Sequence, residues 1–258
     1  MIKRPKILVT NDDGINAQGI RFLIDVVRDL GDVIVVAPDS PQSGMGHAIT
    51  VNSPLRIKMI VEEDGYQEYS CNGTPVDCVK LGEQVVLKGK PDLLVSGINH
   101  GSNAAVNIVY SGTMAAAIEG CIDRIPSIGF SINDFSHNLN FEPTRKYIKH
   151  IAAQVLEKGL KNGICLNVNF PIIENIKGIK VTRQADACWR EEFDSRIDPR
   201  GGNYYWLTGK FVSRDNGHEN DINTMEEGYV SVVPVKIDLT AYNQIDTLKY
   251  LELNNEPK

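Results

Sequence analysis

The chain has 258 residues, of which 42% are hydrophobic and 23% are charged. This is ordinary globular usage, so neither a disordered nor a collagen-like chain fits, and the length suffices for one large domain or two small ones. The formal charge of -6 at pH 7 argues against a protein that grips a nucleic-acid polymer, because such binding depends on a surplus of Lys and Arg.

The cysteines and the apolar runs indicate a cytoplasmic protein. The five cysteines are widely spaced and form no C-x-x-C motif, so we expect reduced thiols rather than a disulfide framework or a zinc knuckle. Only residues 7–10 form an apolar run near the N-terminus, which is too short for a signal peptide. No window approaches the roughly 18 apolar residues of a membrane span, so we expect no membrane contact.

Short apolar runs alternate with helical patterns in the first half of the chain. Ile20, Leu23, Ile24 and Val27, for example, form the apolar stripe of an amphipathic helix. The expected strands are residues 7–10, 32–37, 93–95 and 125–132, with extended or hairpin structure between 48 and 70. The expected helices are residues 20–27, 74–87, 111–122 and 147–156.

This rhythm of strand, helix and strand predicts an α/β fold, a doubly wound and mainly parallel sheet. The character changes near residue 163. Later segments favour strands at 164–170, 179–183 and 229–235, with a polar, Gly-rich stretch at 194–202 and three aromatic residues at 204–206. We therefore predict a catalytic core in residues 1–163. A β-rich region, 164–258, should complete the core and form an oligomerisation arm.

Ligands of doubly wound sheets bind at the carboxyl ends of the strands, and the polar residues at those ends are the candidate site. The first strand ends with the adjacent carboxylates Asp12 and Asp13, which either surround a cation or form a solvated turn. A long Gly- and Ser-rich loop follows the second strand at residues 37–47. The end of a third strand carries Asn99 and His100, where His100 is interpreted as a loop histidine, with proton transfer as the alternative.

The next loop leads into a helix at Ser111-Gly112-Thr113. Free backbone N–H groups and small hydroxyl residues at a helix start suit an anion, although Ser111 could simply cap the helix. The loops together supply Asp, Ser and Asn oxygens and no thiol, which suits Mg²⁺ or Mn²⁺ better than zinc. A metal beside an anion pocket points to phosphoryl chemistry.

The motifs in this order resemble those of the SurE family of survival proteins and 5′/3′-nucleotidases. The resemblance covers nearly the whole chain. The segments that carry it are residues 7–14, 37–44, 72–75, 96–99, 110–113, 166–169, 198–201, 204–207 and 228–232.

The resemblance implies a Rossmann-like core and a metal-dependent phosphatase that hydrolyses nucleoside 5′- and 3′-monophosphates to nucleoside and phosphate, with short polyphosphate left open. It implies one divalent ion per subunit, Mg²⁺ or Mn²⁺, and a homodimer or homotetramer built through the C-terminal region. By position in the motifs, the metal ligands are Asp12, Asp13, Ser43 and Asn99. The phosphate contacts are Asn103, Ser111, Gly112 and Thr113.

In the leading hypothesis the metal binds a phosphate oxygen and lowers the pKa of the attacking water. Asp13 is the preferred catalytic residue to orient or deprotonate that water, and the adjacent Asp12 is the alternative. One alternative is an aspartyl-phosphate phosphatase of the haloacid dehalogenase type, but that pattern needs acids two residues apart, whereas Asp12 and Asp13 are adjacent. Another is a non-catalytic nucleotide-binding stress sensor. Metal-dependent turnover of an aryl phosphate separates the sensor from the enzyme.

Overall fold

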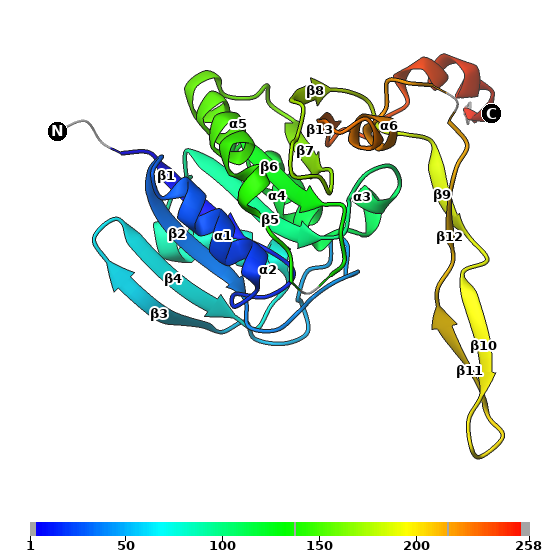
Figure 1. Ribbon diagram of the computed structural model, residues 1–258, viewed down its shortest axis with the longest axis horizontal. Coiled ribbons are helices and arrows are strands. Elements are labelled where there is room, and N and C mark those ends of the chain that lie inside the picture. The colour runs from blue at the N-terminus through cyan, green and yellow to red at the C-terminus, as the bar shows by residue number, and fades with distance from the viewer. Residues whose placement is uncertain (1–3, 137, 216, 254–258) are drawn as a thin grey trace, which may run out of the picture.

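A nine-stranded sheet forms the centre of the protein, whose computed structural model describes residues 4–136, 138–215 and 217–253. Its strands are β1 (Lys6–Thr10), β2 (Asp32–Pro38), β3 (Ile57–Glu63), β4 (Tyr66–Cys71), β5 (Leu93–His100), β6 (Ser127–Ile132), β7 (Ile164–Phe170), β8 (Ile179–Val181) and β13 (Val230–Lys236). They lie in the order β3-β4-β2-β1-β5-β6-β7-β13-β8 (Figure 1). The run from β4 to β7 is parallel throughout, which confirms the predicted α/β, mainly parallel sheet.

Helices cover both faces of this sheet. Helices α1 (Gln18–Val27) and α5 (Arg145–Lys158) pack side by side on one face, and α2 (Pro75–Leu81) and α4 (Gly112–Ile122) pack on the other (Figure 1). A capping box of Thr74 and Asp77 starts α2, with Pro75 at its first position. Within the described ranges no helix has both the length and the apolar character that crossing a bilayer requires.

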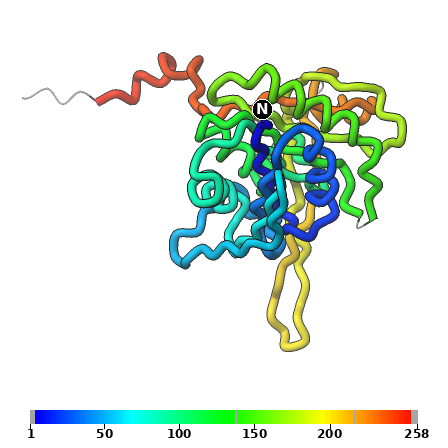
Figure 2. Tube along the Cα trace, turned by 90° about the vertical axis from the view of Figure 1, so that its left-hand side faces the viewer, coloured from blue at the N-terminus to red at the C-terminus, as the bar shows by residue number. Residues whose placement is uncertain are grey.

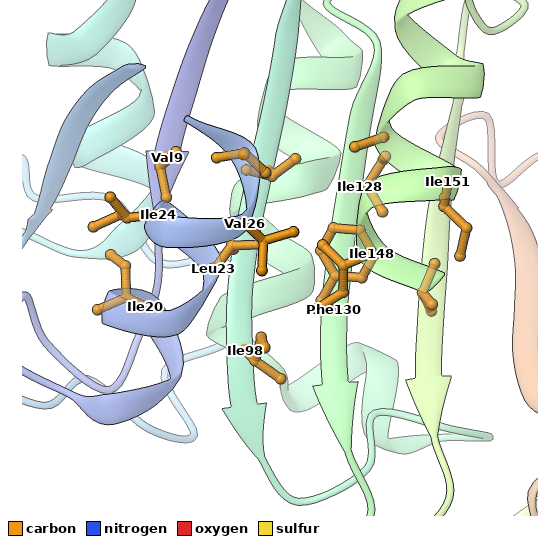
Figure 3. Close-up of a cluster of buried hydrophobic side chains, with 14 of the residues drawn as sticks. Val9, Ile20, Leu23, Ile24, Val26, Ile98, Ile128, Phe130, Ile148 and Ile151 are labelled. Atoms are coloured by element: carbon orange, nitrogen blue, oxygen red, sulfur yellow. The ribbon is translucent and has the colours of Figure 1, made fainter. Parts of the chain in front are cut away.

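The hydrophobic core follows the alternation of the strands and the stripe of α1. Ile7 and Val9 of β1 join the cluster beneath α1 and α5, whereas Leu8 points into the cluster beneath α2 and α4. Figure 3 shows the first cluster, where Leu23 of α1 lies near Phe130 of the sheet. Burying each such side chain contributes about 2 kcal/mol, so this layer holds the strand ends in fixed positions.

Some strands and helices end at other residues than predicted, because contacts with distant segments determine where they end. Strand β5 runs on to His100, past the predicted end at residue 95, because β6 pairs with it as far as that residue. The predicted helix 74–87 continues from α2 as a π-helix, η1 (Gly82–Leu87). A Cβ at Gly82 would lie 2.8 Å from Cδ1 of Leu8, so the glycine permits close packing on the sheet there.

The C-terminal region divides between the sheet and a projecting arm. Strands β7, β13 and β8 belong to the sheet, which therefore extends across residue 163. The arm consists of two narrow ribbons, β9 (Ala187–Arg190) with β12 (Lys210–Ser213) and β10 (Phe193–Ile197) with β11 (Asn203–Leu207). Figure 2 shows it extending away from the body. The stretch 194–202, expected only to be polar and Gly-rich, is thus partly strand β10.

Candidate active site

Two adjacent carboxylates lie at the carboxyl end of β1, in the middle of the parallel sheet. Asp12 is 3% exposed and accepts a hydrogen bond at Oδ1 from the hydroxyl of Thr113. A Cβ at Gly112 would lie 2.7 Å from the Cβ of Asp12, so only glycine lets the start of α4 approach this closely. The carboxylate of Asp12 is therefore pressed against the N-terminus of α4.

The loop after β2 is tied to this turn at two points. The backbone N–H of Gln42 donates to the carbonyl oxygen of Asp12 at 2.7 Å, and that of Gly46 donates to the carbonyl oxygen of Tyr110 at 3.2 Å. Ser43 lies between the two ties and is exposed. The geometry thus brings the loop of Ser43 alongside both Asp12 and the residue that precedes Ser111.

The end of β5 completes the group. The Nδ2 of Asn99 donates to the carbonyl oxygen of Gly101 at 2.8 Å, which leaves Oδ1 as the atom of this amide that could face a cation. His100 lies beside Asp13, with 3.2 Å between Nδ1 and Oδ2. The ring of Phe141 packs edge-on against His100 with centroids 5.7 Å apart, which holds the imidazole at the site.

The electrostatics of the carboxylate pair favour a cation. Burial raises the pKa of Asp12 from its ordinary 3.8 to about 6; the Thr113 hydroxyl opposes this shift and the charge of Asp13 adds to it. In the part of the chain that the structure describes, neither carboxylate has a Lys or Arg partner within ion-pair distance. A divalent ion would supply that missing charge, and the oxygen atoms of Asp12, Asp13, Ser43 and Asn99 are the ligand type that Mg²⁺ or Mn²⁺ prefers.

Within the described ranges no three His, Cys, Asp or Glu side chains form a cluster that could hold a metal ion. A candidate metal centre here therefore depends on the amide of Asn99 and the hydroxyl of Ser43 as well as on the two carboxylates.

Three of the predicted phosphate contacts, Ser111, Gly112 and Thr113, lie at the start of α4, and the fourth, Asn103, lies in the loop after β5. Ser111 caps α4, since its Oγ accepts from the backbone N–H of Met114 at 3.0 Å, and the first-turn N–H groups of Gly112 and Thr113 have no helical acceptor. The Thr113 hydroxyl donates to Asp12, so the backbone N–H of Thr113 is the group that remains for a phosphate. Asn103 is buried, and its Nδ2 donates to Ser131 Oγ at 2.7 Å.

A buried amide network behind the site had not been expected from the sequence. The Oδ1 of Asn169 accepts the backbone N–H of Asn103 at 2.8 Å and the hydroxyl of Ser102 at 3.1 Å. The Nδ2 of Asn167 donates to the carbonyl oxygen of Asn103 at 2.8 Å. Two asparagines spaced by two in an interior strand share one face, and that unusual composition was the available signal.

Residues 7–191 match the family model described as "Survival protein SurE". The chain belongs to the SurE family. A "5'-nucleotidase SurE" of Christiangramia forsetii is 59% identical, covering 98% of this chain and 99% of that one. One of Flavobacterium psychrophilum is 56% identical, covering 98% and 100%. The crystal structure of the SurE protein from Aquifex aeolicus shares 41% identity with a TM-score of 0.83, covering 96% of this chain and 100% of that chain. The predictions of the SurE family and of an enzyme are thereby confirmed.

Proposed function

We propose that this SurE-family enzyme hydrolyses nucleoside monophosphates to nucleoside and phosphate with the help of one divalent cation. The observation that carries the proposal is the pair Asp12 and Asp13, which lacks a Lys or Arg partner among the described residues and lies against the N-terminus of α4. Relatives that match over nearly their whole length carry the name 5'-nucleotidase, which supports the same activity here.

The proposed cation site consists of the oxygen atoms of Asp12, Asp13, Ser43 and Asn99, with Mg²⁺ or Mn²⁺ as the ion. Such an ion, when bound, supplies positive charge to the phosphate and makes water a better nucleophile at neutral pH. The N-terminus of α4, with Ser111, Gly112 and Thr113, offers backbone N–H groups and a positive dipole end to the phosphate oxygens.

The remaining roles follow from the contacts at the site. Asp13 orients the attacking water and accepts its proton, and His100 holds Asp13 in place through the 3.2 Å contact at Nδ1. The Thr113 hydroxyl keeps Asp12 oriented. Asn103 offers the second N–H of its Nδ2 to the phosphate, because Ser131 accepts only one of the two.

The substrate range in this proposal includes 5′- and 3′-nucleoside monophosphates, with short polyphosphate as a further candidate. Both ester positions present the same dianionic phosphate to α4, so the phosphate contacts alone do not discriminate between them. A cytoplasmic setting also belongs to the proposal, and it agrees with the five cysteines, which are all free.

We further propose a homo-oligomer built through the arm. Side chains of the β10–β11 hairpin are largely exposed: Phe193 68%, Tyr205 61%, Trp206 59% and Leu207 70%. An isolated two-stranded hairpin is marginally stable in water, and apolar patches of this kind are typical of interfaces. A second copy of the chain is the proposed occupant, which would make a dimer or tetramer.

The activity is tested by phosphate release from nucleoside monophosphates and from a generic aryl phosphate, with added Mg²⁺ or Mn²⁺. Asp13→Asn should lower kcat by orders of magnitude. The matched control, Asp64→Asn, lies in the exposed β3–β4 turn and should leave kcat unchanged.

Nucleotide binding without turnover by the wild-type chain would favour the stress sensor instead. A phosphate covalently trapped on Asp12 would favour the haloacid dehalogenase type of chemistry.

A further inference from the structure

A fully buried carboxylate in the C-terminal region contacts the backbone of the site. Asp221 is the first residue of α6 (Asp221–Glu226) and is 0% exposed. Its Oδ2 accepts the backbone N–H of Ala105 at 2.8 Å. Its Oδ1 accepts the N–H groups of Ala185 at 2.9 Å and of Ile222 at 3.0 Å. Within the described chain no Lys, Arg or His forms an ion pair with it, so backbone donors alone solvate the charge.

The contact at Ala105 controls a loop that connects two parts of the site. Residues 101–107 join Asn99 to the helical turn before Ser111. Ala105 has φ of 50°, in the left-handed region that disfavours a residue with a Cβ, so its conformation needs support from outside the loop. Asp221 provides that support by accepting the N–H of Ala105. Two residues earlier in the loop, the N–H of Asn103 is held by Asn169. The loop backbone is thus held at alternate residues by side chains from the C-terminal region.

The other end of the same carboxylate holds the root of the arm. Ala185, which donates to Asp221, lies two residues before β9 begins. Beside it, the indole N–H of Trp189 in β9 donates to Oδ1 of Asn107 at 2.8 Å. Ala105, Ala185 and Ala187 pack together in one small apolar cluster. The loop of the site and the start of the arm are therefore joined by hydrogen bonds and by apolar packing.

We propose that Asp221 is a positioning residue for the reaction, which sets the backbone of the 101–107 loop for phosphate binding and couples that loop to the root of the arm. This inference rests on the proposed phosphatase function. Asp221 itself does not touch the substrate, and it acts through the N–H of Ala105.

The test compares Asp221→Asn with Asp215→Asn in the full chain. Asp215 is a matched control because its carboxylate also binds backbone N–H groups nearby, at Gly217 and Asp186, and pairs with Arg183, yet it makes no hydrogen bond with residues 101–107. An asparagine at 221 keeps the size of the side chain but turns an N–H₂ group toward one of three N–H donors. Loss of a charge-assisted hydrogen bond corresponds to about a tenfold change in affinity or more.

The first measurement is the Kd for inorganic phosphate, obtained by isothermal titration calorimetry in the presence of Mg²⁺. Asp221→Asn should raise the Kd for phosphate and the KM for nucleoside monophosphate about tenfold, with a smaller change in kcat. Asp215→Asn should stay within about twofold of the wild type. Equal effects of the two substitutions, or an unchanged Kd in Asp221→Asn, would overturn the inference. Absence of turnover in the wild-type chain would instead refute the proposed function.

Amide hydrogen exchange in the wild-type chain keeps the inference testable if Asp221→Asn does not fold. Phosphate should slow the exchange of the Ala105 N–H, because the ligand and Asp221 stabilise the same loop conformation. A purely structural contact would leave that rate unchanged by phosphate. Exchange of Ala105 that is insensitive to saturating phosphate therefore overturns the coupling.

Discussion

The substitution Asp12→Asn separates the charge of the proposed cation site from its shape. Asparagine keeps the volume of the side chain and an oxygen that can accept from the Thr113 hydroxyl, but it carries no charge. The carboxylate of Asp12 is 3% exposed and has no Lys or Arg partner among the described residues. Removing its charge should therefore stabilise the metal-free fold while it abolishes the activity.

The pKa of Asp12 sets the size and the sign of this effect. Burial raises the pKa of Asp12 from the 3.8 of an ordinary solvated carboxyl to about 6 in the folded chain. The folded state therefore binds the proton more tightly than the unfolded state does. The resulting stability is fully present below about pH 4 and is lost as the pH rises through about 6. A shift of about two pH units corresponds to about 3 kcal/mol of unfolding free energy.

Urea unfolding followed by circular dichroism, in the presence of a chelator, measures the effect at about pH 4 and about pH 8. The free energy of unfolding of Asp12→Asn minus that of the wild type should become more positive by up to about 3 kcal/mol between the two pH values. Taking this difference cancels the other titrating groups. Added Mg²⁺ should raise the stability of the wild type and leave Asp12→Asn unchanged. A difference that does not vary with pH would refute the buried, unpaired charge.

Three further predictions concern the metal, the phosphate and the arm. Exhaustive chelation should abolish phosphate release, and Mg²⁺ or Mn²⁺ should restore it better than Zn²⁺; full activity after chelation would exclude the cation. Ser111→Ala removes the cap on the N–H of Met114, so it should cost about 1 kcal/mol in urea unfolding and weaken competitive inhibition by inorganic phosphate. An unchanged inhibition constant would limit Ser111 to capping. Deletion of residues 193–207 should lower the mass found by light scattering with the sheet intact, and an unchanged mass would contradict the proposed interface.

Local patterns in the sequence were enough to predict the sheet. The apolar run at β1, the stripe of α1 and the Thr74-Pro75 start of α2 each depend on neighbouring residues, and each lies where it was expected. The strand-end rule then placed Asp12 and Asp13 beside the loop of Ser43. The prediction of the sheet succeeded because buried parallel strands leave a strong periodic signal.

Contacts between distant segments left no such signal. Asn169 and Asp221 meet the site loop across 66 and 116 residues of sequence. Helix α6 has only 6 residues, which is too short for a recognisable stripe, and the β10–β11 hairpin of the arm pairs its strands without a buried face. The partner of the Thr113 hydroxyl was likewise fixed by the packing of Gly112 on Asp12 and not by the helix start itself.

The C-terminal half of the chain both completes the sheet and carries the arm, and this decides how truncations must be designed. Strand β13 pairs with β7 along Ser231–Lys236, and β7 carries Asn169, which holds the N–H of Asn103. A cut after Gly228 would therefore remove a sheet strand and release the site loop, so lost activity would say nothing about the oligomer. Deleting the β10–β11 hairpin leaves β13, α6 and the contact from Asp221 to Ala105 in place. Only the hairpin deletion can separate assembly of the subunits from support of the active site.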